Sequence, residues 1–277
     1  MIPFDFEYYR PDTLQEATEV FRQLDIQGKT AVYYGGGTEL ISMARMGNLT
    51  FDAAIDLKGI PDCRALEYGR NRELVLGSAL TLSDITESKQ FPLLEKAAGR
   101  IADHTTQCKI TLGGNLASTI IYRETVLPLL AADSRAVIAD QNGLREFPIR
   151  RLFDKRLNLP KGSFLVKIIT GRELVQAPYF HVKKTRNEKI DYPLLTAAGL
   201  KKDGELRIAF SGLFEFPFRS SEAESILNGS GTCAERAEKT VNLLSDKIRT
   251  DISGSSEFRR YVLKNTLENI LQTMKDT

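Results

Sequence analysis

Two glycine-rich segments carry the residue types and spacing in this sequence that best suit ligand binding. The first, Gly35-Gly36-Gly37, follows a β-prone run at residues 31–34 and precedes a helix-like pattern from Thr38. Glycine lacks a Cβ and accepts positive φ, so a ligand can approach the peptide N–H groups there, and a helix start adds unpaired donors and a positive dipole end. Such a turn suits a phosphate or pyrophosphate. The same residues also occur in a strand-to-helix turn that binds nothing.

A second glycine pair lies in the segment Thr111-Leu112-Gly113-Gly114-Asn115. We expect the fold to bring both glycine segments to one place, where their N–H groups grip opposite sides of an extended pyrophosphate. Neither segment needs a catalytic side chain, since a cofactor with its own reactive ring supplies the chemistry. The sequence therefore predicts a cofactor site in which no residue of this chain is catalytic.

The commonest dinucleotide motif fits the first segment only in part. Gly35, Gly37 and Asp56 lie where a nicotinamide-binding fingerprint places its first two glycines and its acidic residue. The third position is Leu40, whose side chain hinders the close helix-to-strand packing that glycine or alanine permits. A Walker phosphate loop is excluded, because no Gly-Lys-Ser/Thr follows. A stand-alone NAD(P)-dependent dehydrogenase built on residues 31–57 stays open as an alternative.

Composition indicates a globular protein of about two domains. The chain has 277 residues, of which 42% are hydrophobic, and this exceeds the usual size of one domain. Lys and Arg number 38 against 36 Asp and Glu, so the net charge of +2 creates no broad field that would attract nucleic acid or an anionic membrane. The N-terminus lacks the features of a secretory signal, and no stretch is apolar enough to span a bilayer.

The cysteines and histidines offer no metal or redox centre. Cys63, Cys108 and Cys233 are odd in number and far apart, which argues against a disulfide framework, a metal site or an iron–sulfur insert. His104 and His181 are the only histidines, and neither lies in a metal-spaced or triad-like context. We therefore expect a reducing, cytoplasmic location and no covalent histidyl link to a cofactor.

Hydrophobic periodicity and turn signals predict an α+β fold. A helix over residues 14–24 opens with a capping box in which Thr13 is the N-cap and Glu16 reaches back. Strand, glycine turn, helix and strand over residues 31–57 form a βαβ unit. Further elements are expected as strands at 73–77 and 136–139, helical stretches at 82–85 and 93–101, a hairpin turn at Asn142-Gly143, an antiparallel meander over 163–217 and a long C-terminal helix over 258–274. We place a domain boundary near residue 173.

The sequence resembles the FAD-binding subunits of the molybdenum hydroxylases, the family of xanthine dehydrogenase and molybdenum-type carbon monoxide dehydrogenase. The resemblance covers nearly the whole chain. It rests on an opening Tyr9-Arg10-Pro11, on Gly35-Gly36-Gly37-Thr38-Glu39-Leu40 and Thr111-Leu112-Gly113-Gly114-Asn115-Leu116-Ala117 as the two flavin loops, and on Asp191-Tyr192 and Glu257-Phe258-Arg259-Arg260 near the end. Two loops at matching separation are far more specific than one glycine motif.

The resemblance implies a fold and a set of FAD contacts. The fold is a two-subdomain FAD-binding domain of the PCMH type over residues 1–172, split near 57–62, followed by a C-terminal domain of the carbon monoxide dehydrogenase flavoprotein type over 173–277. The implied contacts to non-covalent FAD are Tyr34, Gly35, Gly36, Gly37, Thr38, Glu39, Leu40, Ile101, Thr111, Gly113, Gly114, Asn115, Ser118, Glu124, Leu165, Lys183 and Tyr192.

At three positions near these contacts we have a specific expectation or find a departure from the family pattern. Glu39 lies beside the implied pyrophosphate, so we expect its carboxylate to turn away. Glu124 stands where the family has an aspartate, and it is longer by one methylene. The Ser-Pro pair of the family is replaced by Ile120-Ile121, a change that alters the loop shape and leaves a third alternative open, a cofactor-free assembly or scaffold homologue.

The resemblance also implies a role for the chain in a heteromeric oxidoreductase. Electrons would pass from [2Fe-2S] clusters of a partner subunit through FAD to NAD⁺ or another acceptor. The substrate, for which a purine such as xanthine is one expectation, would be oxidised on a separate molybdopterin-binding subunit. This chain alone would lack that activity, and nucleic acid and membranes are not expected partners.

Overall fold

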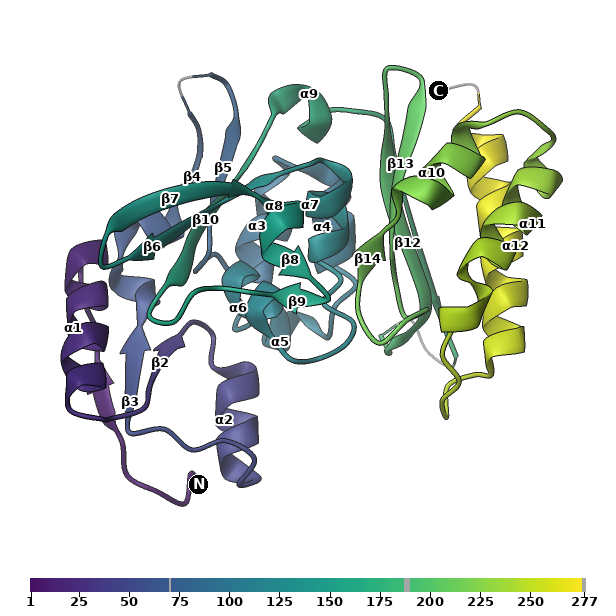
Figure 1. Ribbon diagram of the computed structural model, residues 1–277. Coiled ribbons are helices and arrows are strands. Elements are labelled where there is room, and N and C mark those ends of the chain that lie inside the picture. Colours follow the sequence, from purple (N-terminus) through teal and green to yellow (C-terminus); the bar gives the residue numbers. More distant parts are fainter. Residues whose placement is uncertain (70, 187–189, 276–277) are drawn as a thin grey trace.

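The computed structural model describes residues 1–69, 71–186 and 190–275, which form an α+β structure (Figure 1). Three regions follow one another along the chain. We refer to residues 7–64 as the N-terminal lobe, to residues 66–175 as the central region and to residues 179–273 as the C-terminal region. The central region lies between the other two, which extend from it on opposite sides (Figure 1).

The N-terminal lobe is built on a parallel sheet in which β3 lies between β1 and β2. Its elements are β1 (Glu7–Tyr9), α1 (Leu14–Ile26), β2 (Ala31–Tyr34), α2 (Thr38–Arg45), β3 (Ala53–Asp56), η1 (Leu57–Gly59) and η2 (Pro61–Arg64). The predicted helix over 14–24 and the βαβ unit over 31–57 are confirmed. Because these strands are parallel, their carboxyl ends lie at one edge, where open α/β sheets usually bind ligands. The first glycine segment leaves the sheet at this edge.

The central region holds a sheet with the strand order β4-β5-β10-β6-β7. Its elements are β4 (Leu66–Tyr68), β5 (Leu74–Gly77), α3 (Leu82–Ser88), α4 (Pro92–Ala98), α5 (His104–Gln107), α6 (Leu112–Ala117), α7 (Val126–Ala131), β6 (Arg135–Asp140), β7 (Gly143–Pro148), α8 (Ile149–Leu152), β8 (Phe153–Asp154), β9 (Arg156–Leu157), β10 (Phe164–Thr170) and α9 (Arg172–Val175). The hairpin turn at Asn142-Gly143 is confirmed, since Asp140 pairs with Gly143 across it.

The prediction of one meander over 163–217 was wrong for its first strand. β10 pairs antiparallel with β5 and β6 in the central sheet, whereas β11 begins a separate sheet. The physical reason is that β10 is largely buried and needs a partner on each side, and β5 and β6 provide these. The later strands do form an antiparallel meander, because β11, β12, β13 and β14 follow one another along the chain as hydrogen-bonded neighbours.

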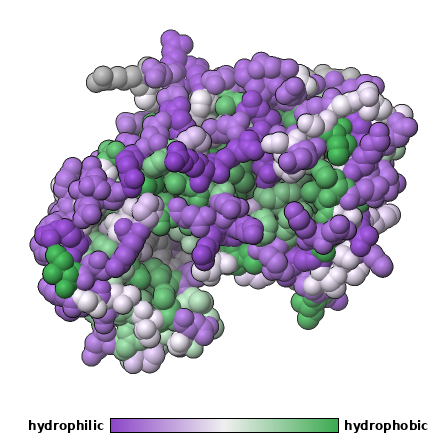
Figure 2. Space-filling model, in the orientation of Figure 1, coloured by the Kyte–Doolittle hydropathy of each residue, from purple (hydrophilic) through white to green (hydrophobic). Residues whose placement is uncertain are grey.

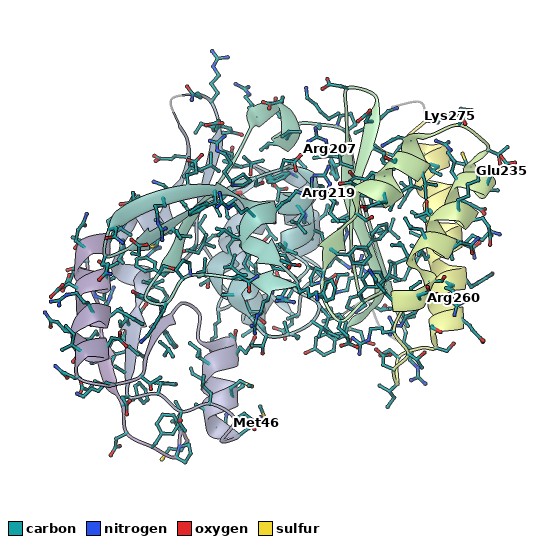
Figure 3. All side chains as sticks on the ribbon, in the orientation of Figure 1. Met46, Arg207, Arg219, Glu235, Arg260 and Lys275 are labelled. Atoms are coloured by element: carbon teal, nitrogen blue, oxygen red, sulfur yellow. The ribbon has the colours of Figure 1, made fainter. Side chains whose placement is uncertain are left out.

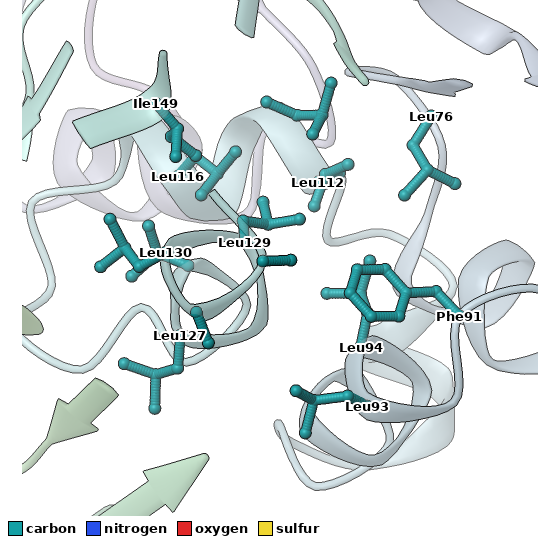
Figure 4. Packing of buried hydrophobic residues seen from close by; sticks show 14 of the residues in the cluster. Leu76, Phe91, Leu93, Leu94, Leu112, Leu116, Leu127, Leu129, Leu130 and Ile149 are labelled. Atoms are coloured by element: carbon teal, nitrogen blue, oxygen red, sulfur yellow. The ribbon is translucent and has the colours of Figure 1, made fainter. Parts of the chain in front are cut away.

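The core of the central region anchors the helix that follows the second glycine pair. Leu112 and Leu116 on α6 are fully buried in one hydrophobic cluster with residues of α4 and α7 (Figure 4). Leu93 and Leu94 of α4 approach from the other side of the same cluster. Fully burying such side chains contributes about 1.5–3 kcal/mol each, so α6 is held firmly in place.

The C-terminal region is a sheet in the order β11-β12-β13-β14 with helices on both faces. Its elements are β11 (Tyr179–Thr185), β12 (Pro193–Lys202), β13 (Glu205–Ser211), β14 (Phe218–Arg219), α10 (Ser221–Asn228), α11 (Cys233–Leu244), η3 (Ser245–Lys247) and α12 (Ser256–Thr273). The predicted long C-terminal helix is confirmed as α12. Helices α10 to α12 cover one face of the sheet, and α4 and α7 of the central region pack against it from the other side (Figure 1).

A network of ion pairs joins the central and C-terminal regions at Asp133. Arg219 donates to Asp133 and to the Leu130 carbonyl, each at 2.7 Å, and also pairs with Glu224 at 2.7 Å. Arg207 donates to the second oxygen of Asp133 at 2.9 Å. Both arginines lie where the C-terminal sheet faces the central region (Figure 3). The two regions are therefore fixed by directed polar bonds as well as by apolar packing.

Arg259 is a fully buried arginine that ties α12 to the C-terminal sheet. Its guanidinium donates to the carbonyl oxygens of Leu194 and Gly212, the latter at 2.7 Å, and to Asp251 at 2.6 Å. These contacts give a structural reason for the Glu257-Phe258-Arg259-Arg260 motif. A buried charge of this kind is stable only while its partners remain.

We predict that Arg259→Met destabilises the chain by about 3 kcal/mol, because Asp251 and two carbonyls lose their partner. Chemical denaturation followed by circular dichroism measures the effect. Arg260→Met is the matched control, since the bond of Arg260 to Ser256 is long, at 3.4 Å. Equal stabilities of the two variants would show that Arg259 does not stabilise the region.

Candidate functional site

The two glycine segments meet in space, as predicted from the sequence. A Cβ on Gly36 would lie 1.7 Å from the carbonyl oxygen of Lys109 and 3.3 Å from the nitrogen of Thr111. A Cβ on Gly35 would lie 2.6 Å from the Thr111 hydroxyl oxygen. Only glycine permits backbone to approach backbone this closely. The turn after β2 is therefore packed directly against the residues that lead into α6.

The third glycine of the first segment has a different requirement. Gly37 is the N-cap of α2 and has a φ of 71°, which lies in the left-handed region that favours glycine. A Cβ there would lie 2.2 Å from the hydroxyl oxygen of Tyr34. The ammonium of Lys58 lies 4.3 Å from the centroid of the Tyr34 ring. Tyr34 thus supports the turn through its ring.

The two segments differ in the N–H groups that they leave free. Among the described residues, none accepts a hydrogen bond from the N–H groups of Gly36, Gly37 or Thr38. In the second segment the N–H groups of residues 112–115 are all used: Leu112 donates to Leu80, Gly113 to Ser78, Gly114 to the Thr111 hydroxyl, and Asn115 to the Thr111 carbonyl. The first segment can therefore bind an anion through its backbone. The second cannot grip it in the way that we expected.

The second segment instead provides shape. A Cβ on Gly113 would lie 2.7 Å from the Cβ of Ser78, so the glycine allows α6 to start close to the end of β5. The Asn115 side chain is also engaged, because its oxygen accepts a hydrogen bond from Thr125 at 2.6 Å. This segment forms a rigid wall against which the first glycine turn rests.

Glu39 links the start of α2 to the residues that follow α6 through its carboxylate. It accepts hydrogen bonds from the hydroxyls of Ser118 and Thr119 and from the Thr119 N–H at 2.8 Å. We expected the Glu39 carboxylate to turn away from a bound anion, and in the structure it points toward Ser118 and Thr119. Partial burial by itself raises the pKa of Glu39, but the bonds from Ser118 and Thr119 outweigh this effect and hold the pKa below its usual value. The carboxylate is therefore ionised at neutral pH.

The segment that departs from the family pattern is braced by Arg123. Its guanidinium donates to the carbonyl oxygens of Ser118, at 3.2 Å, and Lys155, and lies 5.3 Å from the ring centroid of Phe153. Arg123 has a φ of 31°, an unusual value for a residue with a side chain. The chain through Ile120-Ile121 is thus held by a buried arginine.

Glu124 and Lys183 form a buried ion pair between the central and C-terminal regions. Their side chains are 4% and 2% exposed, and the ammonium lies 2.7 Å from the carboxylate. Lys183 also donates to the Arg100 carbonyl at 2.7 Å, and Thr196 donates to Glu124 at 2.6 Å. Burial raises the pKa of Glu124 despite these bonds. Two residues assigned to FAD by resemblance are therefore bonded mainly to each other.

The remaining ring-side residues of the predicted set occupy two kinds of position, exposed and core, and His181 lies near them without belonging to the set. Tyr192 is half exposed, and its ring stacks on Tyr122 with centroids 4.6 Å apart. Leu165 is buried in the core of the central region, against which Ile101 packs partly buried. His181 lies beside Lys183 on β11, and burial lowers its pKa to about 4.

Asp56, the acidic residue of the dehydrogenase alternative, has other partners in this structure. It is 3% exposed and accepts hydrogen bonds from the Tyr8 hydroxyl and from the Lys58 ammonium. A ribose hydroxyl would have to replace one of these. The sheet beside it contains only β1, β2 and β3 in the described part of the chain, which is shorter than a doubly wound nucleotide-binding sheet.

The surface is hollowed where the N-terminal lobe meets the rest of the chain (Figure 2). Two further clefts, of about 660 and 400 Å³, lie between α1 and the β6–β7 hairpin. They do not include the glycine segments. Their charged side chains pair with each other, as in Arg22 with Glu19, Arg145 with Asp140 and Lys161 with Asp25. We assign no ligand to these clefts.

Within the described residues, no set of His, Cys, Asp and Glu side chains is grouped to hold a metal ion. The three cysteines are unpaired. None of the helices of residues 1–69, 71–186 and 190–275 has both the length and the apolar character for crossing a bilayer.

Comparison with protein families adds to this geometry. Residues 4–170 match the model of the FAD binding domain in molybdopterin dehydrogenase, and residues 180–274 match the carbon monoxide dehydrogenase flavoprotein C-terminal domain. The chain belongs to the FAD-binding subunits of the molybdenum hydroxylases. It is thus a subunit of the oxidoreductase class, and its resemblance to this family is confirmed.

Individual relatives of this flavoprotein subunit belong to enzymes that are named for different compounds. The glyceraldehyde dehydrogenase medium chain of Sulfolobus acidocaldarius is 26% identical, covering 95% of this chain and 96% of the relative. A putative xanthine dehydrogenase FAD-binding subunit of Escherichia coli is 23% identical, covering 97% and 96%. A chain of quinoline 2-oxidoreductase from Pseudomonas putida shares the fold, with a TM-score of 0.83 at 22% identity over 98% and 97% of the two chains.

Several residues of this flavoprotein site were missed by sequence reasoning. Lys58 and Tyr8 engage Asp56, and Thr119 binds Glu39, although each lies outside the glycine motifs. The one usable signal was position in the sequence, because Lys58 lies two residues after the end of β3, at the carboxyl edge of the sheet. Thr119 gave no such signal.

We predict that Gly36→Ala lowers the affinity for FAD by about tenfold or more, since the added Cβ would strike backbone that cannot move away. Flavin content after reconstitution measures this. Gly69→Ala is the control, because its Cβ would lie 3.7 Å from the nearest atom. Full flavin content in the Gly36 variant would contradict the close contact of the two segments.

We predict that Glu39→Gln destabilises the chain at pH 7 by about 1 kcal/mol, a modest value because the carboxylate is partly exposed. The pKa of Glu39 is lowered by folding, so its contribution is present above pH 4.5 and is lost as the pH falls through the lowered pKa. The difference from wild type should therefore shrink in acid, as measured by urea unfolding from pH 3 to 7. Glu87→Gln, at an exposed position, is the control. A pH-independent difference would argue against the Glu39 bonds.

Proposed function

We propose that this chain binds FAD non-covalently and passes electrons from [2Fe-2S] clusters of a partner subunit to NAD⁺ or another acceptor. The observation that carries the proposal is the first glycine segment. Its N–H groups at the start of α2 are free, and its backbone packs against the residues that lead into the second segment. A helix start with free amides and no Cβ is the donor set that a diphosphate requires.

The residues present fit FAD. When bound, FAD supplies a ring that accepts and gives up electrons, while the protein binds and orients it. The N–H groups of Gly36, Gly37 and Thr38 would hold the diphosphate. Glu39 would fix the turn from the side by its bonds to Ser118 and Thr119.

The other residues that the family resemblance assigns to FAD are part of the same proposal and form two groups. One group lies at or near the glycine segments and consists of Tyr34, Gly35, Leu40, Thr111, Gly113, Gly114, Asn115 and Ser118. In this group Gly113, Gly114 and Asn115 would contact FAD by their shape, because their N–H groups are already bonded. The ring-side group consists of Ile101, Glu124, Leu165, Lys183 and Tyr192. Exposed Tyr192 can reach a ring directly. The buried Glu124 and Lys183 would act by holding the central and C-terminal regions at a fixed spacing.

The proposal also covers the partner subunits, the cellular location and the domain limits of the chain. An iron–sulfur subunit and a molybdopterin-binding subunit would be its partners, with substrate oxidation on the latter, in the cytoplasm. The domains would be residues 1–172, with the split near 57–62, and 173–277. Two relatives are named for glyceraldehyde and xanthine, so purine metabolism is one of at least two settings that the proposal allows.

The competing functions are separated by Asp56 and by flavin content. In a stand-alone NAD(P)-dependent dehydrogenase Asp56 would bind ribose, but here it bonds to Tyr8 and Lys58. A cofactor-free scaffold would not need free N–H groups in the first glycine segment. Both alternatives predict a purified chain without flavin.

The test is reconstitution of the purified chain with FAD. We expect a yellow protein whose flavin spectrum persists after gel filtration and whose flavin is released by acid, as a non-covalent cofactor requires. A folded chain, shown by circular dichroism, that binds NAD⁺ or nothing would overturn the proposal. Co-purification from the native source then identifies the partner subunits.

A further inference from the structure

Lys58 lies at the carboxyl edge of the parallel sheet and contacts the first glycine segment directly. Its ammonium donates to the Gly35 carbonyl oxygen at 2.8 Å and to the two Asp56 oxygens at 2.9 and 2.8 Å. An ammonium has three protons, and these acceptors lie on two different strand ends. Lys58 therefore ties the turn after β2 to the end of β3.

The anchor of this lysine is itself fixed. Asp56 is 3% exposed, and it also accepts hydrogen bonds from the Lys58 N–H at 2.9 Å and from the hydroxyl of Tyr8, the middle residue of β1. The bond to Asp56 raises the pKa of Tyr8 to about 12, so this hydroxyl stays a donor at neutral pH. The Lys58 ammonium is thus held by residues at the ends of β2 and β3, and Tyr8 on β1 fixes the carboxylate that it binds.

Peptide geometry connects this anchor to ligand binding. The peptide joining Gly35 to Gly36 is trans, so the Gly35 C=O and the Gly36 N–H point in opposite directions. Because Lys58 holds the carbonyl toward the sheet edge, the Gly36 N–H is directed away from Lys58. Gly36 is one of the three residues whose N–H groups have no acceptor among the described residues.

We propose that Lys58, held by Asp56 and Tyr8, is a positioning residue that orients the Gly36 N–H for a diphosphate. The inference rests on the proposed FAD function and deepens it. Packing against Lys109 and Thr111 fixes where the turn lies, whereas the Lys58 bond fixes how the peptide between Gly35 and Gly36 is rotated. Without that bond the glycine peptide loses a restraint on its rotation, and binding must then order it. Asp56 neutralises the charge of Lys58, so the effect is one of geometry rather than of direct attraction to phosphate.

The experiment measures the dissociation constant for FAD by flavin fluorescence at low and high salt. We expect Lys58→Met to weaken binding roughly 10- to 100-fold, the effect of losing one charge-assisted hydrogen bond. The factor should be the same at both salt concentrations, whereas a direct ammonium–phosphate contact would be screened by salt. Lys29→Met is the control, because Lys29 pairs with exposed Glu7.

A second variant guards against simple unfolding. Lys58→Met alone leaves Asp56 buried without its cation, so Lys58→Met combined with Asp56→Asn removes both charges. We expect the double variant to keep a circular dichroism spectrum and a melting temperature close to those of wild type. Its affinity for FAD should nevertheless remain reduced, as in the single Lys58→Met variant. Tyr8→Phe, which removes only one support, should show a smaller loss.

The outcomes separate this inference from the proposed function. If wild type binds FAD and both Lys58 variants bind it equally well, the positioning role is overturned and the function stands. A loss that disappears at high salt would overturn it in favour of direct phosphate contact. If wild type binds no FAD, the proposed function is overturned and this inference with it.

Discussion

The structure depends on one close contact, between the glycine turn after β2 and the backbone before α6. Gly36 has no room for a side chain against Lys109, and Gly35 has little against Thr111. This contact joins the N-terminal lobe to the central region at the place where the free N–H groups lie. Protein backbones are rigid at such distances, so the turn cannot shift without separating the two regions. The position of the donors is therefore set by packing rather than by a ligand.

Charged groups reinforce this arrangement on both sides of the contact. Glu39, at the start of α2, accepts hydrogen bonds from Ser118 and Thr119 in the central region. The buried ion pair of Glu124 and Lys183 joins the central region to the C-terminal region. A buried pair of this kind gains little stability over apolar residues, but breaking it is costly. Its value lies in fixing the relative positions of two sheets, a requirement for any cofactor bound between them.

Local signals in the sequence were sufficient for much of the fold. Glycine and turn residues located both glycine segments and the hairpin at Asn142-Gly143, and periodicity located α1 and α12. The resemblance to a known family added the expectation that the two glycine segments lie together in space. Membership of a sheet was harder, because the partners of β10 are set by contacts far along the chain.

The candidate site was predictable in its backbone and less so in its side chains. The sequence showed which glycines would admit an anion, but it did not show that the N–H groups of residues 112–115 were already used. Nor could it pair Glu124 with Lys183, which are 59 positions apart. Hydrogen-bond partners at that separation depend on the final packing, which no local pattern records.

The late arrival of β10 has a consequence for synthesis on the ribosome. β10 is the central strand of its sheet, yet it follows β5 by more than eighty residues in sequence. Until residue 170 has left the exit tunnel, β5 and β6 each expose an unpaired edge beside a large apolar surface. Nascent chains in that state are prone to aggregate, and non-local pairing is slow. The growing polypeptide therefore passes through a vulnerable interval during which chaperone protection is of most use.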